Sequence, residues 1–305
     1  MATEHRKVQD GPLFTVPGDI MDAAAAHKIV LAAANSWRLA TARAARGVRR
    51  KLVDEFPGDE LPEAFWHDAS SKQFREFFLW GHDHDFGHAM TRKGAMGARH
   101  IEITAESVQL GFLASDLRGL QVLDIGCWSG GDVLVLSGLG AAVTATEEHA
   151  GSAGSARRLM ELVGCPAQVL EQSAFRDDPA WRQRFDIVYC SGVLYHVSDP
   201  VLLLRICFSY LRPGGRLIIE TKADTQSDGS ACRYSGTAVK GWNFYAPSRV
   251  ALARWFLDAG FHAGDIQIHT RAMQRFLACG VKRQAAALPE SAGFSRPGSW
   301  LEGEN

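Results

Sequence analysis

An acid and two glycines directly follow a short apolar run near the middle of the chain. Residues Val122–Gly130 read VLDIGCWSG and lead into an apolar helical stretch. A β-type run that ends in an acid and a glycine-containing turn is how a parallel sheet presents a strand end to a nucleotide-like ligand. A second predicted strand, Ala141–Thr146, is followed by Glu147, whose carboxylate can accept hydrogen bonds from both hydroxyls of a ribose. We therefore expect a nucleoside-binding site formed by Asp124, the glycine turn and Glu147.

The spacing of the glycines favours a ligand without phosphates. Gly126 and Gly130 do not form a GxGxxG pattern, so the tight turn and the close packing that a dinucleotide pyrophosphate needs are not both present. The pattern resembles the first motif of the class I S-adenosylmethionine (SAM) methyltransferases, D-x-G-x-G-x-G, with Trp128 in place of the middle glycine. This resemblance implies an α/β fold with a Rossmann-like, seven-stranded, doubly wound sheet and SAM as the donor.

Length and composition limit the remaining possibilities. With 305 residues and 46% apolar content, the chain can bury one sheet core and a smaller accessory region. Its 33 basic and 34 acidic residues nearly cancel, so there is no global field for nucleic acid or anionic membranes. The six cysteines form no CxxC pair and are interpreted as core residues in a reducing compartment. We expect a cytoplasmic protein that is neither secreted nor inserted in a membrane.

The order of predicted elements gives the domain organisation. Residues 19–51 predict a long helix, and residues 62–80 predict a second helix with many aromatic side chains. From Gln121 onward, short strands alternate with helical stretches, which is typical of a parallel sheet. The predicted strands are Val122–Ile125, Ala141–Thr146, Ala167–Glu171, Phe185–Cys190 and Leu217–Thr221. The expected parts are an N-terminal helical cap (1–92), a SAM-binding methyltransferase domain (93–283) with a substrate-side insertion (222–249), and a flexible C-terminal tail (284–305).

Ligands of doubly wound sheets bind at the carboxyl ends of the strands, so the residues after each strand are candidate site residues. The backbone and small side chains after the third strand would hold adenine. The stretches SGVLYHVSDP (Ser191–Pro200) and LRPGG (Leu211–Gly215) follow in the order found in the second half of class I methyltransferases. The residues predicted to bind the donor are Asp124, Gly126, Cys127, Trp128, Gly130, Glu147, Glu148, Gln172, Ser173, Ala174, Ser191 and Lys93.

A closer resemblance covers roughly residues 92–283. The runs Ser191–Thr221 and Trp242–Phe261 (WNFYAPSRVALARWFLDAGF) are similar to the bacterial tRNA wobble-uridine carboxymethyltransferases. That family uses carboxy-SAM and holds the extra carboxylate with a lysine, a tyrosine and an arginine. The resemblance implies these roles for Lys93, Tyr195 and Arg275.

The segment before Lys93 favours a different acceptor. It is crowded with acids and imidazoles, which suit a polyamine or an amino-sugar, and gentamicin-type aminoglycoside N-methyltransferases are also similar to the chain at this level. The basic stretch Arg38–Lys51 could instead contact tRNA. The residues predicted to bind the substrate are His82, His84, Asp85, His88, Trp242, Asn243, Tyr245 and Arg275. The histidine–aspartate run lacks a compact ligand set, so we predict a solvated, substrate-contacting loop and no metal.

Methyl transfer from a sulfonium requires an aligned nucleophile and the removal of one proton. His196 is the first candidate for the base, His84 and Asp85 are its rivals, and Tyr195 would position the donor or the substrate. The favoured function is methylation of an amine, or alternatively a hydroxyl, of a polar small molecule such as an amino-sugar in antibiotic biosynthesis. Two alternatives stay open: a tRNA wobble-uridine carboxymethyl- or methyltransferase that uses carboxy-SAM or SAM, and a catalytically inactive SAM-binding regulatory protein. The oligomeric state is not predicted.

Overall fold

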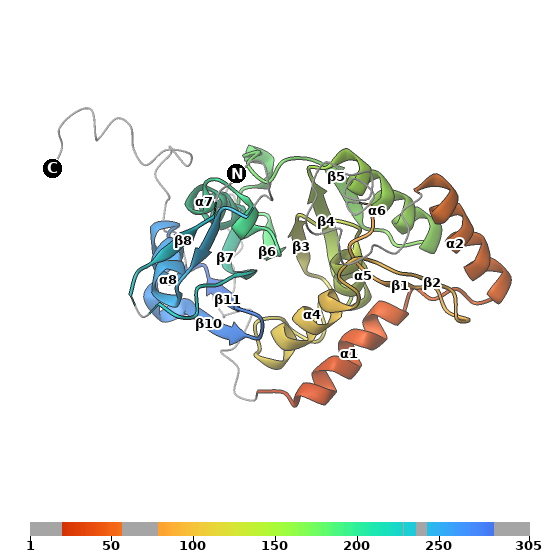
Figure 1. The fold of residues 1–305 in the computed structure, drawn as a ribbon, viewed down its shortest axis with the longest axis horizontal. Helices are drawn as coiled ribbons and strands as arrows, with labels where there is room; N and C mark the ends of the chain where they lie inside the picture. Colours follow the sequence, from red (N-terminus) through yellow and green to blue (C-terminus); the bar gives the residue numbers. More distant parts are fainter. Residues whose placement is uncertain (1–19, 57–78, 228, 236–242, 284–305) are drawn as a thin grey trace, which may run out of the picture.

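A seven-stranded sheet forms the centre of the computed structural model, which describes residues 20–56, 79–227, 229–235 and 243–283 (Figure 1). The strand order is β10-β11-β7-β6-β3-β4-β5. The strands from β3 to β7 are parallel, whereas β11 is antiparallel to both β7 and β10. The strands are β3 (Gln121–Ile125), β4 (Ala142–Glu147), β5 (Gln168–Glu171), β6 (Phe185–Ser191), β7 (Leu211–Lys222), β10 (Ile266–Arg271) and β11 (Arg275–Val281). The predicted α/β, doubly wound class is confirmed.

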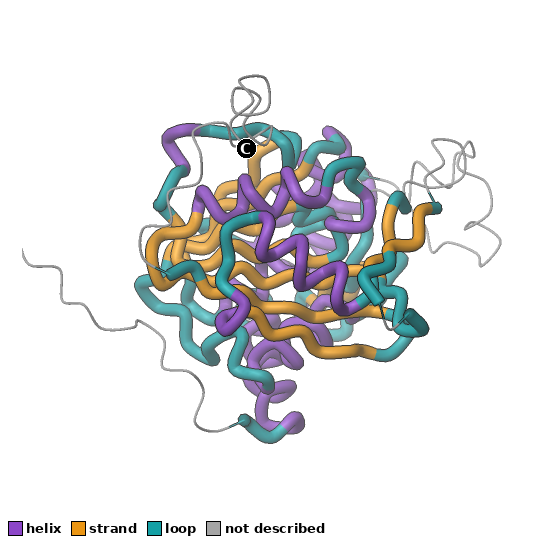
Figure 2. The backbone as a smooth tube through the Cα atoms, turned by 90° about the vertical axis from the view of Figure 1, so that its left-hand side faces the viewer, coloured by secondary structure: helices purple, strands orange, loops and turns teal. Residues whose placement is uncertain are grey.

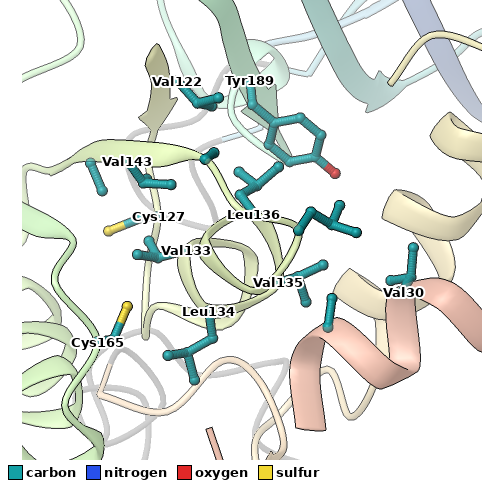
Figure 3. Packing of buried hydrophobic residues seen from close by; sticks show 14 of the residues in the cluster. Val30, Val122, Cys127, Val133, Leu134, Val135, Leu136, Val143, Cys165 and Tyr189 are labelled. Atoms are coloured by element: carbon teal, nitrogen blue, oxygen red, sulfur yellow. The ribbon is translucent and has the colours of Figure 1, made fainter. Parts of the chain in front are cut away.

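Helices cover both faces of the sheet (Figure 2). Val122 and Tyr189 point to a core shared with the helices of one face, whereas Leu123 and Val188 point to a core under the helices of the other. Figure 3 shows the first of these cores, in which α5 packs beneath Val122 and Tyr189. The first face carries α1 (Ala23–Asn35), α4 (Arg99–Gln109), α5 (Gly131–Gly138) and α6 (Ala150–Val163), and the second carries α7 (Pro200–Tyr210) and α8 (Arg249–Asp258). Helix α2 (Ala42–Glu55) packs on α6.

Short elements complete the described fold and several of them border the site. Two small hairpins flank the large sheet, and single 3-10 turns join its helices and strands. These elements are β1 (His84–Asp85), β2 (Thr91–Arg92), β8 (Cys232–Tyr234), β9 (Tyr245–Pro247), η2 (Pro179–Trp181), η3 (Leu194–His196) and η4 (Ala263–Asp265).

The N-terminal region differs from its prediction. The single long helix over residues 19–51 is wrong, because the chain forms α1 and α2 with a break between them. Ser36 ends α1, and the Thr41 side chain caps α2 by accepting a hydrogen bond from Ala44 N at 3.2 Å. The predicted helix over 62–80 and the tail over 284–305 fall almost entirely outside the described residues, although Trp80 is described and buried.

The fifth parallel strand is longer than predicted. It begins at Leu211, which pairs with Phe185 of β6, so the LRPGG sequence, which lies before the predicted strand Leu217–Thr221, belongs to the strand. Five of the six cysteines are buried and Cys232 is exposed. Among the described helices, none has the length and apolar content needed to cross a membrane.

A buried histidine cluster joins the N-terminal cap to the sheet. His82, His84 and His100 are each at most 8% exposed, and the rings of His82 and His100 lie 4.6 Å apart. His82 Nδ1 accepts a hydrogen bond from Gly131 N at the start of α5, at 3.2 Å. The prediction of a solvated loop is therefore wrong for His82 and His84, because these imidazoles pack between the cap and the end of β3. Burial lowers the pKa of His84 to about 3 and that of His100 to about 4.

These histidines make the fold sensitive to acid. In the unfolded chain an imidazole has a pKa near 6.5, so below about pH 6.5 the unfolded state binds protons that the folded state does not. The free energy of unfolding should fall as the pH decreases from about 6.5 towards 4, by roughly 1.4 kcal/mol per pH unit for each buried imidazole. Urea denaturation at several pH values should show a shallower pH dependence for His100→Gln than for wild type. His27→Gln, at an exposed position, is the control, and equal slopes for all three proteins would contradict the expectation.

Candidate active site

The loop after β3 crosses the exits of β3 and β4. The amides of Gly126 and Cys127 both donate to the carbonyl of Thr146, at 2.8 and 3.0 Å, and Gly130 N donates to Cys127 O at 2.8 Å. Gly126 adopts a left-handed φ of +73° and lies so close to Val193 that a side chain there would collide with it. The loop thus touches the segment that follows β6. The segments that follow the first and fourth predicted strands, β3 and β6, therefore lie side by side at one edge of the sheet.

Glu147 holds this loop by its carboxylate. Its Oε2 accepts a hydrogen bond from Trp128 N at 3.0 Å, and its Oε1 accepts one from His149 N at 2.9 Å. Burial raises the pKa of Glu147. Each carboxylate oxygen has a further lone pair, so the group can also accept hydrogen bonds from ligand hydroxyls. Glu148, also predicted to bind the donor, follows it and is exposed.

Asp124 supplies a second acceptor at the same strand end. It is 1% exposed, and its Oδ2 has no hydrogen-bond partner among the described residues. Burial, and then the nearby Asp132 and Glu147, raise the pKa of Asp124 well above its usual range. An unsatisfied buried acceptor beside a left-handed glycine turn is the feature expected of a site that a polar ligand completes. Asp124 can thus accept a hydrogen bond from a polar ligand, and its role in binding SAM stays a prediction.

Trp128 replaces a glycine of the resembled motif and joins the loop to the cap. Its φ is +48°, in the left-handed region, where a residue with a side chain costs roughly 1–2 kcal/mol relative to glycine. Its ring packs on Gly81, where any side chain would collide with it, and lies 5.6 Å from the ring of His82. The neighbouring Ser129 Oγ accepts hydrogen bonds from Gly81 N and His82 N, both at 3.0 Å. Trp128 therefore packs between the cap and the donor loop, which is the loop after β3 at residues 126–130.

The three residues predicted to hold adenine follow β5, next to Glu147. Gln172 N donates to the carbonyl of Glu147 at 3.0 Å, and Ser173 Oγ accepts a hydrogen bond from Phe175 N at 3.3 Å. Ala174 is partly buried against the second core. The structure places them beside the donor loop, and their role in adenine binding stays a prediction.

The segment after β6 carries the predicted catalytic pair. Ser191 ends the strand opposite Glu220, and η3 places the rings of Tyr195 and His196 3.9 Å apart. The amide of Phe244 donates a hydrogen bond to Tyr195 O at 2.7 Å. This bond attaches the end of the predicted insertion (222–249) to η3.

Two of the insertion residues predicted to bind the substrate are described. Asn243 is half-buried and directly precedes Phe244, and the ring of Tyr245 lies 5.4 Å from that of Tyr234. Trp242 lies outside the described residues.

Two cationic side chains, Arg275 and Lys222, lie near the ring of Tyr195. Arg275 Nε donates to Glu220 Oε1 at 2.6 Å, and its guanidinium carbon lies 4.6 Å from the centre of the Tyr195 ring. Lys222 Nζ lies 5.4 Å from the same ring, whereas Lys93 Nζ donates to Asp83 Oδ2 at 3.0 Å. The structure therefore brings Tyr195 and Arg275 together. It also reveals Lys222, which sequence reasoning missed although the residue stands at a strand exit.

The remaining predicted substrate residues lie against the connection between α1 and α2. Asp85 forms an ion pair with Arg38, and His88 Nε2 lies 3.1 Å from the carbonyl oxygen of Leu39. Within the described ranges, no group of three or more His, Cys, Asp or Glu side chains is arranged to hold a metal ion.

Comparisons with known proteins find relatives that are named methyltransferases or carboxymethyltransferases. A tRNA U34 carboxymethyltransferase of Desulfotalea psychrophila is 29% identical over 153 residues, which make up 50% of this chain and 48% of that protein. A ubiquinone biosynthesis O-methyltransferase of Xanthomonas campestris pv. campestris is 30% identical over 200 residues, covering 57% of this chain and 82% of that protein. The chain thus spans about half the length of the first of these relatives.

One solved structure shows the same fold over most of the chain. The N-terminal domain of EvdMO1, solved with SAH bound, aligns with a TM-score of 0.52 and 18% identity, covering 78% of this chain and 97% of that one. The family model described as a methyltransferase domain matches residues 99–263, more than half of the sequence. Because this match covers more than half of the sequence and includes β3 to β7, the chain belongs to the methyltransferase domain family.

Proposed function

We propose that this enzyme transfers a methyl group from SAM to an oxygen or nitrogen nucleophile of a polar small molecule held between η3 and the ends of β6 and β7. The observation that carries the proposal is the contact of Gly126 with Val193, which sets the donor loop directly against the segment bearing Tyr195 and His196. Donor and acceptor groups held at these two strand exits would be neighbours, as a single displacement requires.

Bound SAM supplies a methyl group that is already activated by its sulfonium. The residues that would hold it are Asp124, the backbone of the glycine turn, and Glu147, with residues 172–174 on the adenine side. The chain itself must then orient the acceptor and take up one proton. His196 is the proposed base, and Tyr195, held by its contact with Arg275, is the proposed positioning group.

An amino-sugar acceptor has less support than the sequence indicated. The acids of the cap segment are neutralised by cations, since Asp83 pairs with Lys93 and Asp85 pairs with Arg38. At the other side of the site Glu220 is held by Arg275. None of these carboxylates is left to recognise an ammonium group, so a neutral or anionic acceptor fits the described residues better.

Carboxymethyl transfer to tRNA is a second candidate, favoured by the contact of Tyr195 with Arg275 and by the relatives named tRNA U34 carboxymethyltransferase. Incubation with SAM or carboxy-SAM and either bulk tRNA or a panel of small hydroxy and amino compounds separates the two. We expect methyl transfer from SAM to a small compound. Transfer from carboxy-SAM to tRNA alone would reverse the order of the two proposals.

Loss of the Glu147 carboxylate should weaken donor binding. Hydrogen bonds to a charged group contribute about 1.5–3 kcal/mol, so the Kd for SAM should rise by roughly tenfold to a hundredfold in Glu147→Ala. Isothermal titration with SAM and with S-adenosylhomocysteine measures this change. Glu161→Ala, which removes an exposed acid on α6, should bind as wild type does. Unchanged affinity in Glu147→Ala would contradict the assigned donor site.

The catalytic pair has a separate test. If His196 takes the proton, His196→Asn should lower kcat by about a hundredfold or more while the Kd for SAM changes little. Tyr195→Phe should lower kcat/KM for the acceptor. Transfer of tritiated methyl groups measures both. A wild-type protein that binds SAM but methylates neither tRNA nor any small compound would favour the inactive regulatory protein, and full activity in His196→Asn would exclude His196 as the base.

A further inference from the structure

Basic side chains line the edge of the sheet beyond the proposed donor site. Lys222 ends β7 and lies opposite Arg275 at the start of β11, and Arg271 at the end of β10 lies opposite Arg275 on the other side. Arg99 begins α4, the helix that Figure 1 shows beside the end of the β10–β11 hairpin. These four cations come from four different elements, and Arg275 is a neighbour of each of the other three.

The nearby carboxylates neutralise only part of this charge. Glu220 is 1% exposed and is engaged by Arg275 through two nitrogens and by Arg271 Nη1 at 3.3 Å. Glu106 on α4 is the second partner of Arg271. Within the part of the chain that the structure describes, Arg99 and Lys222 have no carboxylate within 4.0 Å. The edge therefore carries an uncompensated positive charge centred on these two residues.

Burial and like charge act on both side chains, and the attraction of Glu220 offsets part of their effect on Arg99. Burial and the neighbouring Arg275 lower the pKa of Arg99, and the same two causes lower the pKa of Lys222. The Nε atom of Arg99 is buried without a hydrogen-bond partner among the described residues. Arg99 and Lys222 share Arg275 as a neighbour, so an anion held beside the Arg275 guanidinium would satisfy the Arg99 donor and reduce the repulsion on both side chains.

This charge lies near η3 and the end of β7, where the acceptor is proposed to bind. Lys222 Nζ and the Arg275 guanidinium carbon lie 5.4 and 4.6 Å from the centre of the Tyr195 ring, and the Tyr195 ring contacts that of His196. An anion bound by Lys222 would therefore lie near His196, the proposed base. It would lie far from Glu147, because β6 and β3 separate β7 from β4 in the sheet.

We propose that Arg99 and Lys222 form a subsite for an anionic group of the acceptor, a carboxylate or a phosphate, so that the enzyme methylates an acid. This inference rests on the proposed function and names its substrate class. Arg275 and Arg271, held by Glu220 and Glu106, form the rigid wall behind the subsite. A carboxylate on the donor would have the same chemistry, and the experiment separates the two sources.

Inorganic phosphate is the probe for the subsite. Titration calorimetry into the full-length protein saturated with S-adenosylhomocysteine, against sodium chloride of equal ionic strength, should show phosphate binding. The phosphate Kd should rise at least tenfold in Lys222→Met and in Arg99→Gln. Arg254→Gln, which removes an exposed arginine on α8, is the matched control and should bind phosphate as wild type does. No phosphate binding, or equal affinity in the double variant Lys222→Met/Arg99→Gln, would overturn the proposal.

Two further arms assign the source of the anion and separate this proposal from the donor site. SAM should bind wild type and both variants alike, and carboxy-SAM should bind wild type no tighter than SAM does. Carboxy-SAM that binds at least tenfold tighter than SAM in wild type but not in the variants would assign the subsite to the donor and overturn the acceptor assignment. If the protein bound neither SAM nor S-adenosylhomocysteine, the proposed function would fail, and phosphate binding by the free protein would still test the cation pair.

Discussion

The carboxylate of Glu147 sets the geometry on which the rest of the site depends. By accepting hydrogen bonds from the backbone of Trp128 and of His149, it joins the loop after β3 to the turn after β4. Without this link, no hydrogen bond from Glu147 would offset the conformational strain of the left-handed backbone at Trp128. Because the loop is held there, Gly126 lies against Val193. This contact brings the donor loop next to the segment that carries Tyr195 and His196.

Several buried polar side chains lie close together on one face of the sheet. Asp124, Asp132 and Tyr189 lie between β3, β6 and α5, and Thr104 of α4 bonds to the Tyr189 hydroxyl at 3.2 Å. Burial and the charge of Glu220 raise the pKa of Asp132 to about 7. Such a network stabilises a fold only weakly, because desolvation offsets its hydrogen bonds. Its place beneath the strand ends is consistent with a requirement of the site rather than of the core.

The sequence allowed the fold and the grouping of residues at the strand ends to be predicted, because both depend on local patterns. Strand ends in a parallel sheet meet at one edge, so Asp124, Glu147 and Ser191 could be grouped without any long-range information. The burial of His82 could not be predicted, since its imidazole contacts Gly131 and His100, which are distant in sequence. The pairing of Asp83 with Lys93 and of Asp85 with Arg38 escaped prediction for the same reason. Charge neutralisation is a property of side chains meeting in space, and a run of acids does not reveal it.

The indole of Trp128 has a consequence for how this molecule can vary. Its ring fills the space over Gly81, and a side chain at position 81 would have to occupy the same volume. A large side chain can therefore be accommodated at one of the two positions but not at both, so a chain with glycine at 128 would have room for a larger residue at 81. Positions 81 and 128 therefore form a size-complementary pair, in which a larger side chain at 81 requires a smaller one at 128.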